Sequence, residues 1–202
     1  MATTHGDVKR KRMGAKKPLY AVITAENKGT FPTYGEVKEF SRFIALTEAI
    51  QTAEAKFYSD NAIDDDMKIF KQCDLTFEND GLTHNASSEV FGLKMSEEGE
   101  LIYGGKNDPP YIGYAFFREL KGAGDKRYYE GVYYPKCKAF VPNSTDNTRG
   151  ENITFKGDTV SMSAYTLDDE AETWKVEFIL ETEAEAEAWC RAKLGGAAAT
   201  GE

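Results

Sequence analysis

The sequence has 202 residues and a formal net charge of −9 at pH 7, a length that suits one large domain or two small ones. Residues 1–17 hold six basic residues and one acid, so the remaining chain carries 19 basic and 33 acidic residues, a net charge of −14. An acidic body of this kind repels nucleic-acid phosphates, which argues against a protein that binds DNA tightly. No segment approaches the roughly 20 apolar residues that a membrane-spanning helix needs.

The three cysteines, Cys73, Cys137 and Cys190, lie far apart and lack the close spacing of a metal or redox motif. We therefore expect free thiols in a reducing compartment. The basic N-terminal segment is followed by no apolar run, so we also expect no secretory signal.

Low hydrophobicity and clustered charge in residues 1–17 are typical of a flexible segment. We divide the chain into a flexible basic arm at 1–17, a β-domain at 18–180, and a C-terminal helix with its tail at 181–202. The arm either docks on an acidic neighbour or stays solvated as a free terminus. The residues that would make its contacts are Lys9, Arg10, Lys11 and Arg12.

Most of the chain consists of short segments rich in β-branched and aromatic residues, separated by turn-forming residues. In chain order, the predicted strands are Leu19–Ala25, Tyr34–Phe40, Phe43–Tyr58, Met67–Glu78, Leu101–Tyr103, Tyr111–Leu120, Arg127–Tyr134, Lys136–Val141, Asn152–Phe155, Thr159–Thr166 and Thr173–Leu180. A short helix is expected to begin after Thr83, as its N-cap, and to stop near Gly92. This pattern predicts one mainly β domain with helical decoration.

The two longest predicted strands, Phe43–Tyr58 and Met67–Glu78, read as an extended hairpin. In the second strand, apolar and polar residues alternate, with interruptions only at Phe70 and Lys71. The alternation places Met67, Ile69, Cys73, Leu75 and Phe77 against Lys68, Gln72, Asp74, Thr76 and Glu78, and in the first strand Ile44, Leu46 and Ile50 against Thr47 and Gln51. This period of two predicts one buried face and one solvated face. An ordinary antiparallel pair would show it, and so would a strand pair that lines a pore.

A polar link, Ser59–Asp66, joins these two strands, and its acidic residues are Asp60, Asp64, Asp65 and Asp66. These residues lack the alternating spacing and terminal glutamate of a calcium-binding loop. We expect the link to be mobile in the free chain and ordered when it docks on a basic partner surface.

The segment Glu183–Leu194 is predicted to be helical, because Thr182 and Glu185 form a capping box in front of it. The apolar stripe at helical spacing is Ala184, Ala188, Trp189 and Ala192, with Trp189 as its anchor. The stripe either covers the sheet of its own domain or crosses to a neighbouring subunit.

A search for catalytic chemistry finds no constellation of reactive residues. His5 and His84, the two histidines, are not clustered with other metal ligands, and no serine stands in a nucleophile turn. The tyrosine-rich segments belong to an acidic body, which argues against stacking on nucleic-acid bases. We therefore expect no enzyme activity, no metal and no cofactor.

Several segments together resemble the major tail protein, the tail tube subunit of long-tailed, non-contractile bacteriophages. These segments are Lys17–Thr24, Thr33–Val37, Ala53–Asp60, Asp80–Gly92, Pro110–Arg118, Arg127–Tyr134, Gly150–Phe155 and Thr173–Val176. The resemblance covers roughly Pro18 to Phe178. The basic arm and the C-terminal helix lie outside it.

The resemblance implies a tail-tube-type β-sandwich or barrel with a short flanking helix. It also implies hexameric rings that stack into a tube, through whose lumen the DNA passes without specific binding. The implied partners are other copies of the chain, a tape measure protein, a tail terminator and baseplate or tip proteins, and no membrane is involved. The protein would be made in the host bacterial cytoplasm and would reside in the virion tail.

Within that scheme the solvated hairpin face would line the lumen through Gln51, Gln72, Asp74, Thr76 and Glu78. The acidic link, with Asp60, Asp64, Asp65 and Asp66, would contact the next ring. The alternative class is a monomeric β-sandwich adhesin or carbohydrate-binding module, which would use exposed aromatic residues. Its candidates are Tyr111, Tyr114, Tyr128 and Tyr133.

Overall fold

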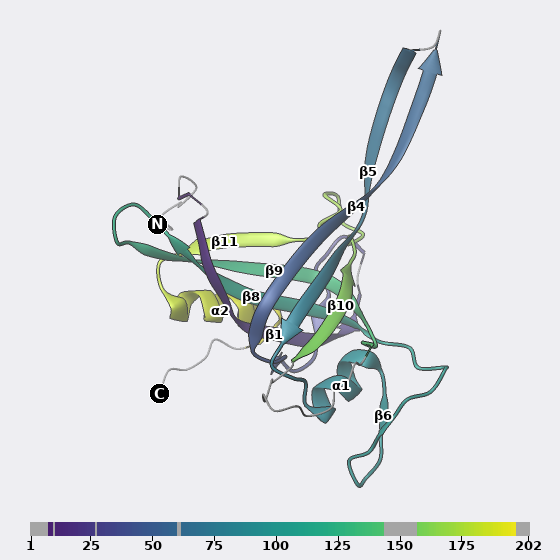
Figure 1. Cartoon of the computed structure of the whole chain (residues 1–202), viewed down its shortest axis with the longest axis vertical. Helices are drawn as coiled ribbons and strands as arrows, with labels where there is room; N and C mark the ends of the chain where they lie inside the picture. The colour runs from purple at the N-terminus through teal and green to yellow at the C-terminus, as the bar shows by residue number, and fades with distance from the viewer. Residues whose placement is uncertain (1–7, 10, 27, 60–61, 144–156, 197–202) are drawn as a thin grey trace, which may run out of the picture.

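The computed structural model describes residues 8–9, 11–26, 28–59, 62–143 and 157–196, and for residues 55–59 and 62–67 it describes the backbone alone. The chain is mainly β, as the sequence predicts, and its described part contains eleven strands and two helices (Figure 1). In chain order they are β1 (Lys11–Ala25), β2 (Thr33–Tyr34), β3 (Lys38–Glu39), β4 (Phe43–Ser59), β5 (Ala62–Asn79), α1 (His84–Phe91), β6 (Lys94–Met95), β7 (Leu101–Ile102), β8 (Tyr111–Lys121), β9 (Arg127–Phe140), β10 (Asp158–Ala164), β11 (Val176–Leu180) and α2 (Glu183–Lys193).

Nine of these strands form one antiparallel sheet, in the order β2-β1-β8-β9-β10-β5-β4. Two strands lie off this path, because β11 pairs with β9 and β3 pairs with β1. β6 and β7 form a separate two-stranded sheet. The large sheet bends on itself, so side chains of β5 pack against side chains of β8 in a sandwich-like arrangement (Figure 1).

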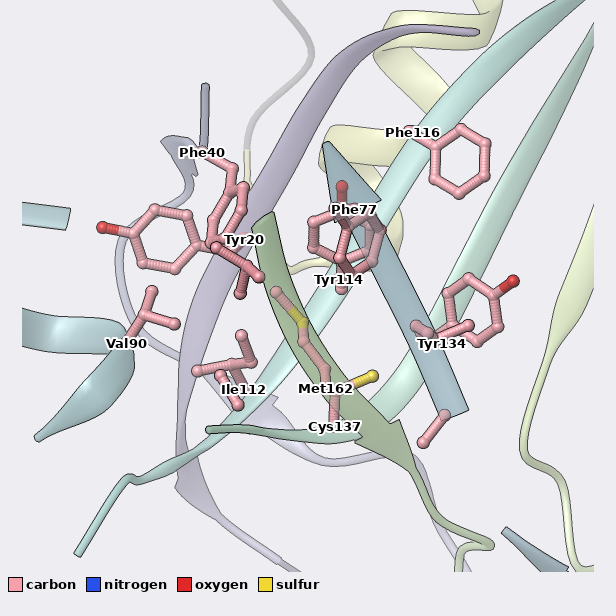
Figure 2. Packing of buried hydrophobic residues seen from close by; sticks show 14 of the residues in the cluster. Tyr20, Phe40, Phe77, Val90, Ile112, Tyr114, Phe116, Tyr134, Cys137 and Met162 are labelled. Carbon is pink, nitrogen blue, oxygen red and sulfur yellow. The ribbon is translucent and has the colours of Figure 1, made fainter. Parts of the chain in front are cut away.

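The main core fills the space between the two halves of this bent sheet (Figure 2). Ile112, Tyr114 and Phe116 of β8 all point into it, because alternate side chains of a strand share one face. Phe77 of β5 meets Tyr114 with ring centroids 4.8 Å apart, and Phe40 meets the same ring edge-on at 5.7 Å. Eight of the twelve largest fully buried side chains of the described chain are aromatic, and such rings bury a large apolar area each.

α1 closes one end of this core and has the predicted caps. The side chain of Thr83 accepts a hydrogen bond from the backbone N–H of Ala86 at 3.2 Å. At the other end Gly92 has a left-handed φ of 62° and lies against the backbone of Asp108, where a β-carbon would collide. Between the caps the helix buries Val90 on the core.

A second core lies under α2, on the opposite face of β1, β8 and β9. Its fully buried members are Leu19, Ala21, Ala115, Phe117, Tyr133, Ala186, Cys190 and Leu194. The helix begins with the predicted capping box, in which both hydrogen bonds between Thr182 and Glu185 are present. α2 therefore covers the sheet of its own chain.

The predicted apolar stripe of α2 is wrong in three of its four members. Ala184 and Ala192 are exposed and Ala188 is only half-buried, whereas Ala186 and Cys190 face the sheet. Cysteine and alanine are small, so the helix approaches the sheet closely on that side. Trp189 is half-buried beside this contact, and its ring stacks on Phe178 with centroids 6.1 Å apart.

The structure also places the start of the β-domain earlier in the chain than the sequence predicts. β1 begins at Lys11, and Lys11–Lys16 pair with Phe117–Lys121 of β8, so this part of the expected flexible arm is a strand. This pairing gives hydrogen-bond partners to backbone N–H and C=O groups along that edge of β8. Lys16 and Lys17 then reach α2 and form ion pairs with Glu183 and Glu187.

Two further segments differ from the sequence prediction. Tyr34–Phe40 is not one strand, because only the two-residue strands β2 and β3 form there. Arg127–Phe140 is one continuous strand that includes Pro135, although the sequence suggested two strands. Proline lacks an N–H donor, and it is tolerated where the partner of β9 changes from β11 to β10. The predicted strand Asn152–Phe155 lies outside the described residues.

Candidate functional site

The solvated face of the β4–β5 hairpin is present where the alternation predicts it. Cys73, Leu75 and Phe77 are fully buried in the main core. Gln72 and Asp74, whose side chains point to the other face, are half-buried, and Thr76 and Glu78 are exposed there.

The strand register extends this polar face over three strands. Gln51 of β4 lies opposite Gln72 of β5, and Thr47 lies opposite Thr76, so these pairs share one face. On the other side of β5, Thr159, Ser161 and Ser163 of β10 lie opposite Glu78, Thr76 and Asp74. We call this surface the polar face; its members are Thr47, Gln51, Gln72, Asp74, Thr76, Glu78, Thr159, Ser161 and Ser163.

Sequence reasoning missed the contribution of β10 to this face. A signal was available, since Ser161 and Ser163 alternate with the apolar residues Val160, Met162 and Ala164. The alternation predicts a two-faced strand, but it does not say that β10 pairs with β5. Pairing between strands about 90 residues apart is a property of the fold.

A hydrogen-bonded triangle stabilises the centre of the polar face. Ser163 donates from Oγ to Oδ1 of Asp74 at 2.8 Å. The side-chain amide of Gln72 donates to the same Oδ1 at 2.8 Å and contacts Oγ of Ser163 at 3.3 Å. The three side chains hold one another in place, so the acid in this region is fixed rather than free to move.

The polar face carries hydroxyl and amide groups and only two acids, Asp74 and Glu78. Two lysines on β9, Lys136 and Lys138, are held by Glu26 at 2.5 Å and Asp108 at 2.7 Å. The surface therefore offers mainly hydroxyl and amide groups, and among the described residues beside it Lys71, in the bulge next to Gln72, is an exposed cation.

A β-bulge explains the two interruptions in the alternating pattern. Gln51 pairs with Gln72, but the next residue of β4, Thr52, pairs with Phe70, so Lys71 has no partner opposite it. The extra residue reverses the facing of the strand, and Phe70 turns toward the core and packs against it. Beyond the bulge, Ile69 is left on the exposed side.

The hairpin extends well past the rest of the molecule (Figure 1). Among the described side chains of this part, Thr52, Ala53, Glu54, Lys68 and Ile69 are exposed. β4 also forms hydrogen bonds on one side only, because it is the last strand of the sheet. The hairpin therefore presents a long free strand edge, and these five described side chains beyond the bulge are uncovered.

The acidic link is shorter than the sequence suggested. β4 continues to Ser59 and β5 starts at Ala62, so the backbone of Asp64, Asp65 and Asp66 belongs to a strand. Their side chains, and the whole of Asp60, lie outside the described residues. The basic residues expected to contact this link are Lys9, Lys11 and Arg12, all exposed, and Arg10, which is not described.

A buried ionic cluster lies behind the hairpin. Arg118 of β8 binds Glu130 of β9 and Glu177 of β11, each at 2.6 Å, and Lys175 binds Glu48 of β4 at 2.6 Å. Burial favours the neutral form of Glu48, but the hydrogen bond and charge of Lys175 outweigh it and hold the pKa of Glu48 below its ordinary value. The cluster thus joins the hairpin electrostatically to three other strands.

The aromatic residues that would support a glycan-binding surface are mostly unsuited to that role. Tyr114 and Tyr133 are fully buried, and the hydroxyl of Tyr133 is hydrogen-bonded to that of Tyr34. Tyr128 is half-buried, and Tyr111 is exposed with the ammonium group of Lys136 4.4 Å from its ring centroid. The expectation of four exposed tyrosines is therefore wrong for at least Tyr114 and Tyr133.

The described residues contain no cluster of His, Cys, Asp or Glu side chains arranged to hold a metal ion. All three cysteines are free and buried, and burial raises the pKa of Cys73 to about 11 and that of Cys190 to about 12, which makes them poor nucleophiles at neutral pH. Neither helix of the described chain is long and apolar enough to cross a membrane. Compared with known proteins, the chain matches no family model, and no curated protein matches it either.

Proposed function

We propose that this protein is a structural virion protein, the subunit of a phage tail tube. Copies of the chain would form hexameric rings that stack into a tube and conduct the genome into the host cell. The observation that carries the proposal is the β4–β5 hairpin, which leaves the body with a free strand edge and with exposed side chains just beyond the bulge.

An isolated two-stranded hairpin is marginally stable in water, so a projecting hairpin of this length needs a partner. Its exposed apolar residues Ile50 and Ile69 also favour burial in an assembly. A second copy of the chain is the simplest partner, because identical copies can repeat one contact along a filament.

The polar face supports the same proposal, as the wall of a lumen. It would bring Asp74 and Glu78, six times in each ring, close to the passing DNA. Like charges on wall and DNA, together with the hydroxyl groups of β10, disfavour adhesion. In this scheme Gln51, Gln72 and Thr76 line the same wall.

The remaining parts of the proposal follow from the resemblance to tail tube proteins. The partners would be other copies of the chain, a tape measure protein, a tail terminator and baseplate or tip proteins. The protein would have no catalytic activity and no cofactor. It would be made in the cytoplasm of the host bacterium and end in the virion.

Electron microscopy of the purified protein tests the proposal. We expect hollow tubes or rings at high protein concentration. A variant in which residues 53–68 are replaced by a short turn should remain folded and monomeric, since this segment lies beyond the bulge. A parent protein that stays monomeric at all concentrations, and above all one that binds glycans as a monomer, would contradict the proposal.

A further inference from the structure

The loop between β10 and β11, residues 165–175, contacts the hairpin where it leaves the body. Trp174 stacks on Phe70 of β5 with ring centroids 4.9 Å apart and an angle of 19° between the planes. The next residue, Lys175, donates a hydrogen bond to Glu48 of β4 at 2.6 Å. One loop therefore holds both strands of the hairpin, next to the β-bulge at Lys71.

This loop is itself held rigid by internal hydrogen bonds. The carboxylate of Asp169 accepts bonds from the backbone N–H and from the hydroxyl of Thr173, both at 2.7 Å. These bonds from Thr173 hold the pKa of Asp169 below its ordinary value. The backbone N–H of Leu167 also donates to the carbonyl of Thr173 at 3.0 Å, and the Leu167 side chain is buried. The loop is thus a fixed part of the body.

The contact residues are anchored on β9. The ring of Trp174 lies 6.4 Å from that of Tyr134, which is fully buried in the main core. The ammonium group of Lys175 lies 5.5 Å from the Tyr134 ring centroid and 2.9 Å from Glu177. Both contact residues are therefore tied to the central strand β9 as well as to the hairpin.

We propose that Trp174 and Lys175 form a buttress that fixes the direction in which the hairpin leaves the body, with the bulge at Lys71 as its pivot. A bulge bends its strand and increases the local twist, so it is a natural hinge. Beyond it, the described side chains of Thr52 and Ile69 are exposed.

The length of the hairpin makes its direction important. From Thr52 to Ser59 the strand runs for about 23 Å at roughly 3.3 Å per residue, so a swing of about 10° moves its end by about 4 Å. That displacement approaches the spacing of paired strands, about 4.8 Å. The geometry of the free chain carries this inference without the proposed function, and only its consequence for tube growth rests on that function.

Spin labels on the hairpin and on the body test the buttress in the monomer. Ser59→Cys places one label at the far end of β4, and Ala192→Cys places the other on the exposed side of α2. Pulsed electron paramagnetic resonance then measures the distribution of distances between the two labels. We expect a narrow distribution in the labelled parent and a clearly broader or shifted one after Trp174→Ala.

Phe178→Ala is the matched control, because Phe178 is an aromatic residue of β11 that stacks on Trp189 instead of the hairpin. It should keep the narrow distribution of the parent. Phe70→Leu serves if Trp174→Ala does not fold, since it removes the stacked ring but keeps an apolar side chain. A folded Trp174→Ala or Phe70→Leu protein with an unchanged distribution would overturn the buttress. Failure of the parent to form tubes would contradict the proposed function and leave the spin-label result intact.

Discussion

Arg118 is a cation that the fold encloses with carboxylates. Its side chain is 5 % exposed, that of Glu130 is fully buried, and Glu177 completes the contact from a third strand. Removing two charges from water is costly, and their attraction offsets the cost only while both remain. The stability of this site therefore depends on its completeness more than on any single pair.

Arg118→Met tests that dependence. We expect a loss of about 3–5 kcal/mol in the free energy of unfolding, because the carboxylate of Glu130 would remain buried beside an apolar side chain. Arg127→Met is the control: Arg127 is paired with Glu119 on the surface, and exposed pairs contribute about 0–1 kcal/mol. Urea unfolding of both variants measures the difference. Similar losses in the two variants would show that burial of the cluster does not matter.

Glu48 gives the cluster a dependence on pH. Its pKa is lowered in the folded chain, so its contribution to stability is complete above the ordinary carboxyl pKa of about 4.3 and is lost as pH falls through the folded value. The charged or titratable groups that face it are Lys175, Arg118, Tyr134 and Cys73. We expect acid to destabilise the parent in this range.

Glu48→Gln should remove part of that acid dependence. The variant has no carboxyl to protonate at this position, so its stability should fall less steeply than that of the parent below about pH 4.5. Thermal melting at a series of pH values measures both slopes. Glu97→Gln, which removes an exposed carboxyl on the loop between β6 and β7, should follow the parent. An unchanged slope in Glu48→Gln would contradict the assignment.

At the residue scale, local patterns were predictable and long-range partners were not. The alternation around Cys73, Leu75 and Phe77 follows from the two-residue period of a strand, and the structure buries all three. The pairing of Arg118 with Glu177 joins positions 59 apart, and no local spacing specifies it. Charged residues at such positions look like solvated ones until the fold is known.

At the scale of elements, the β-bulge shows why a strand can be predicted from sequence while the face on which some of its residues lie cannot. The sequence locates the break in the pattern at Phe70 and Lys71 but does not say which residue faces the core. The facing of Phe70 depends on its contact with Trp174, a residue of the loop between β10 and β11. The capping box of α2 was predictable because both its members lie within four residues.

The face of α2 that contacts the sheet was not predictable, because it depends on a position in the sheet that lacks a side chain. Gly131 of β9 supplies that position: a β-carbon there would lie 2.5 Å from Cε3 of Trp189. Gly131→Ala should therefore cost roughly 1–3 kcal/mol through overpacking.

Trp189→Ala should lower the melting temperature of the monomer, with a loss below the roughly 3–5 kcal/mol of a fully buried tryptophan.

The double variant separates the two effects. If the alanine at position 131 destabilises only by colliding with the indole ring, adding Gly131→Ala to Trp189→Ala should cost little or nothing further. Denaturant unfolding of the two single variants and the double variant gives the coupling energy directly. Additive losses would mean that Gly131 is required for some reason other than the space occupied by Trp189.

At the scale of the whole molecule, the fold separates its surfaces by chemistry. α2 covers one face of β1, β8 and β9, the main core fills the bend of the sheet, and the polar face of β4, β5 and β10 remains open to solvent. The β4–β5 hairpin projects far from this body (Figure 1). A tube built from such subunits would place polar, acidic groups on one wall and apolar contacts between neighbours.

Reversing one charge on the polar face tests its orientation in that tube. Glu78 is exposed at the end of the face, so Glu78→Lys should leave folding and assembly intact. If the face lines the lumen, each ring would gain six lysines facing the channel, and the tubes should retain double-stranded DNA. Retention should weaken as salt rises, because binding through phosphates releases counterions. Sedimentation of tubes with labelled DNA at several salt concentrations measures it.

Glu97→Lys makes the same change of charge on the loop between β6 and β7, outside the polar face. Equal retention by both variants would place the polar face elsewhere than on the lumen.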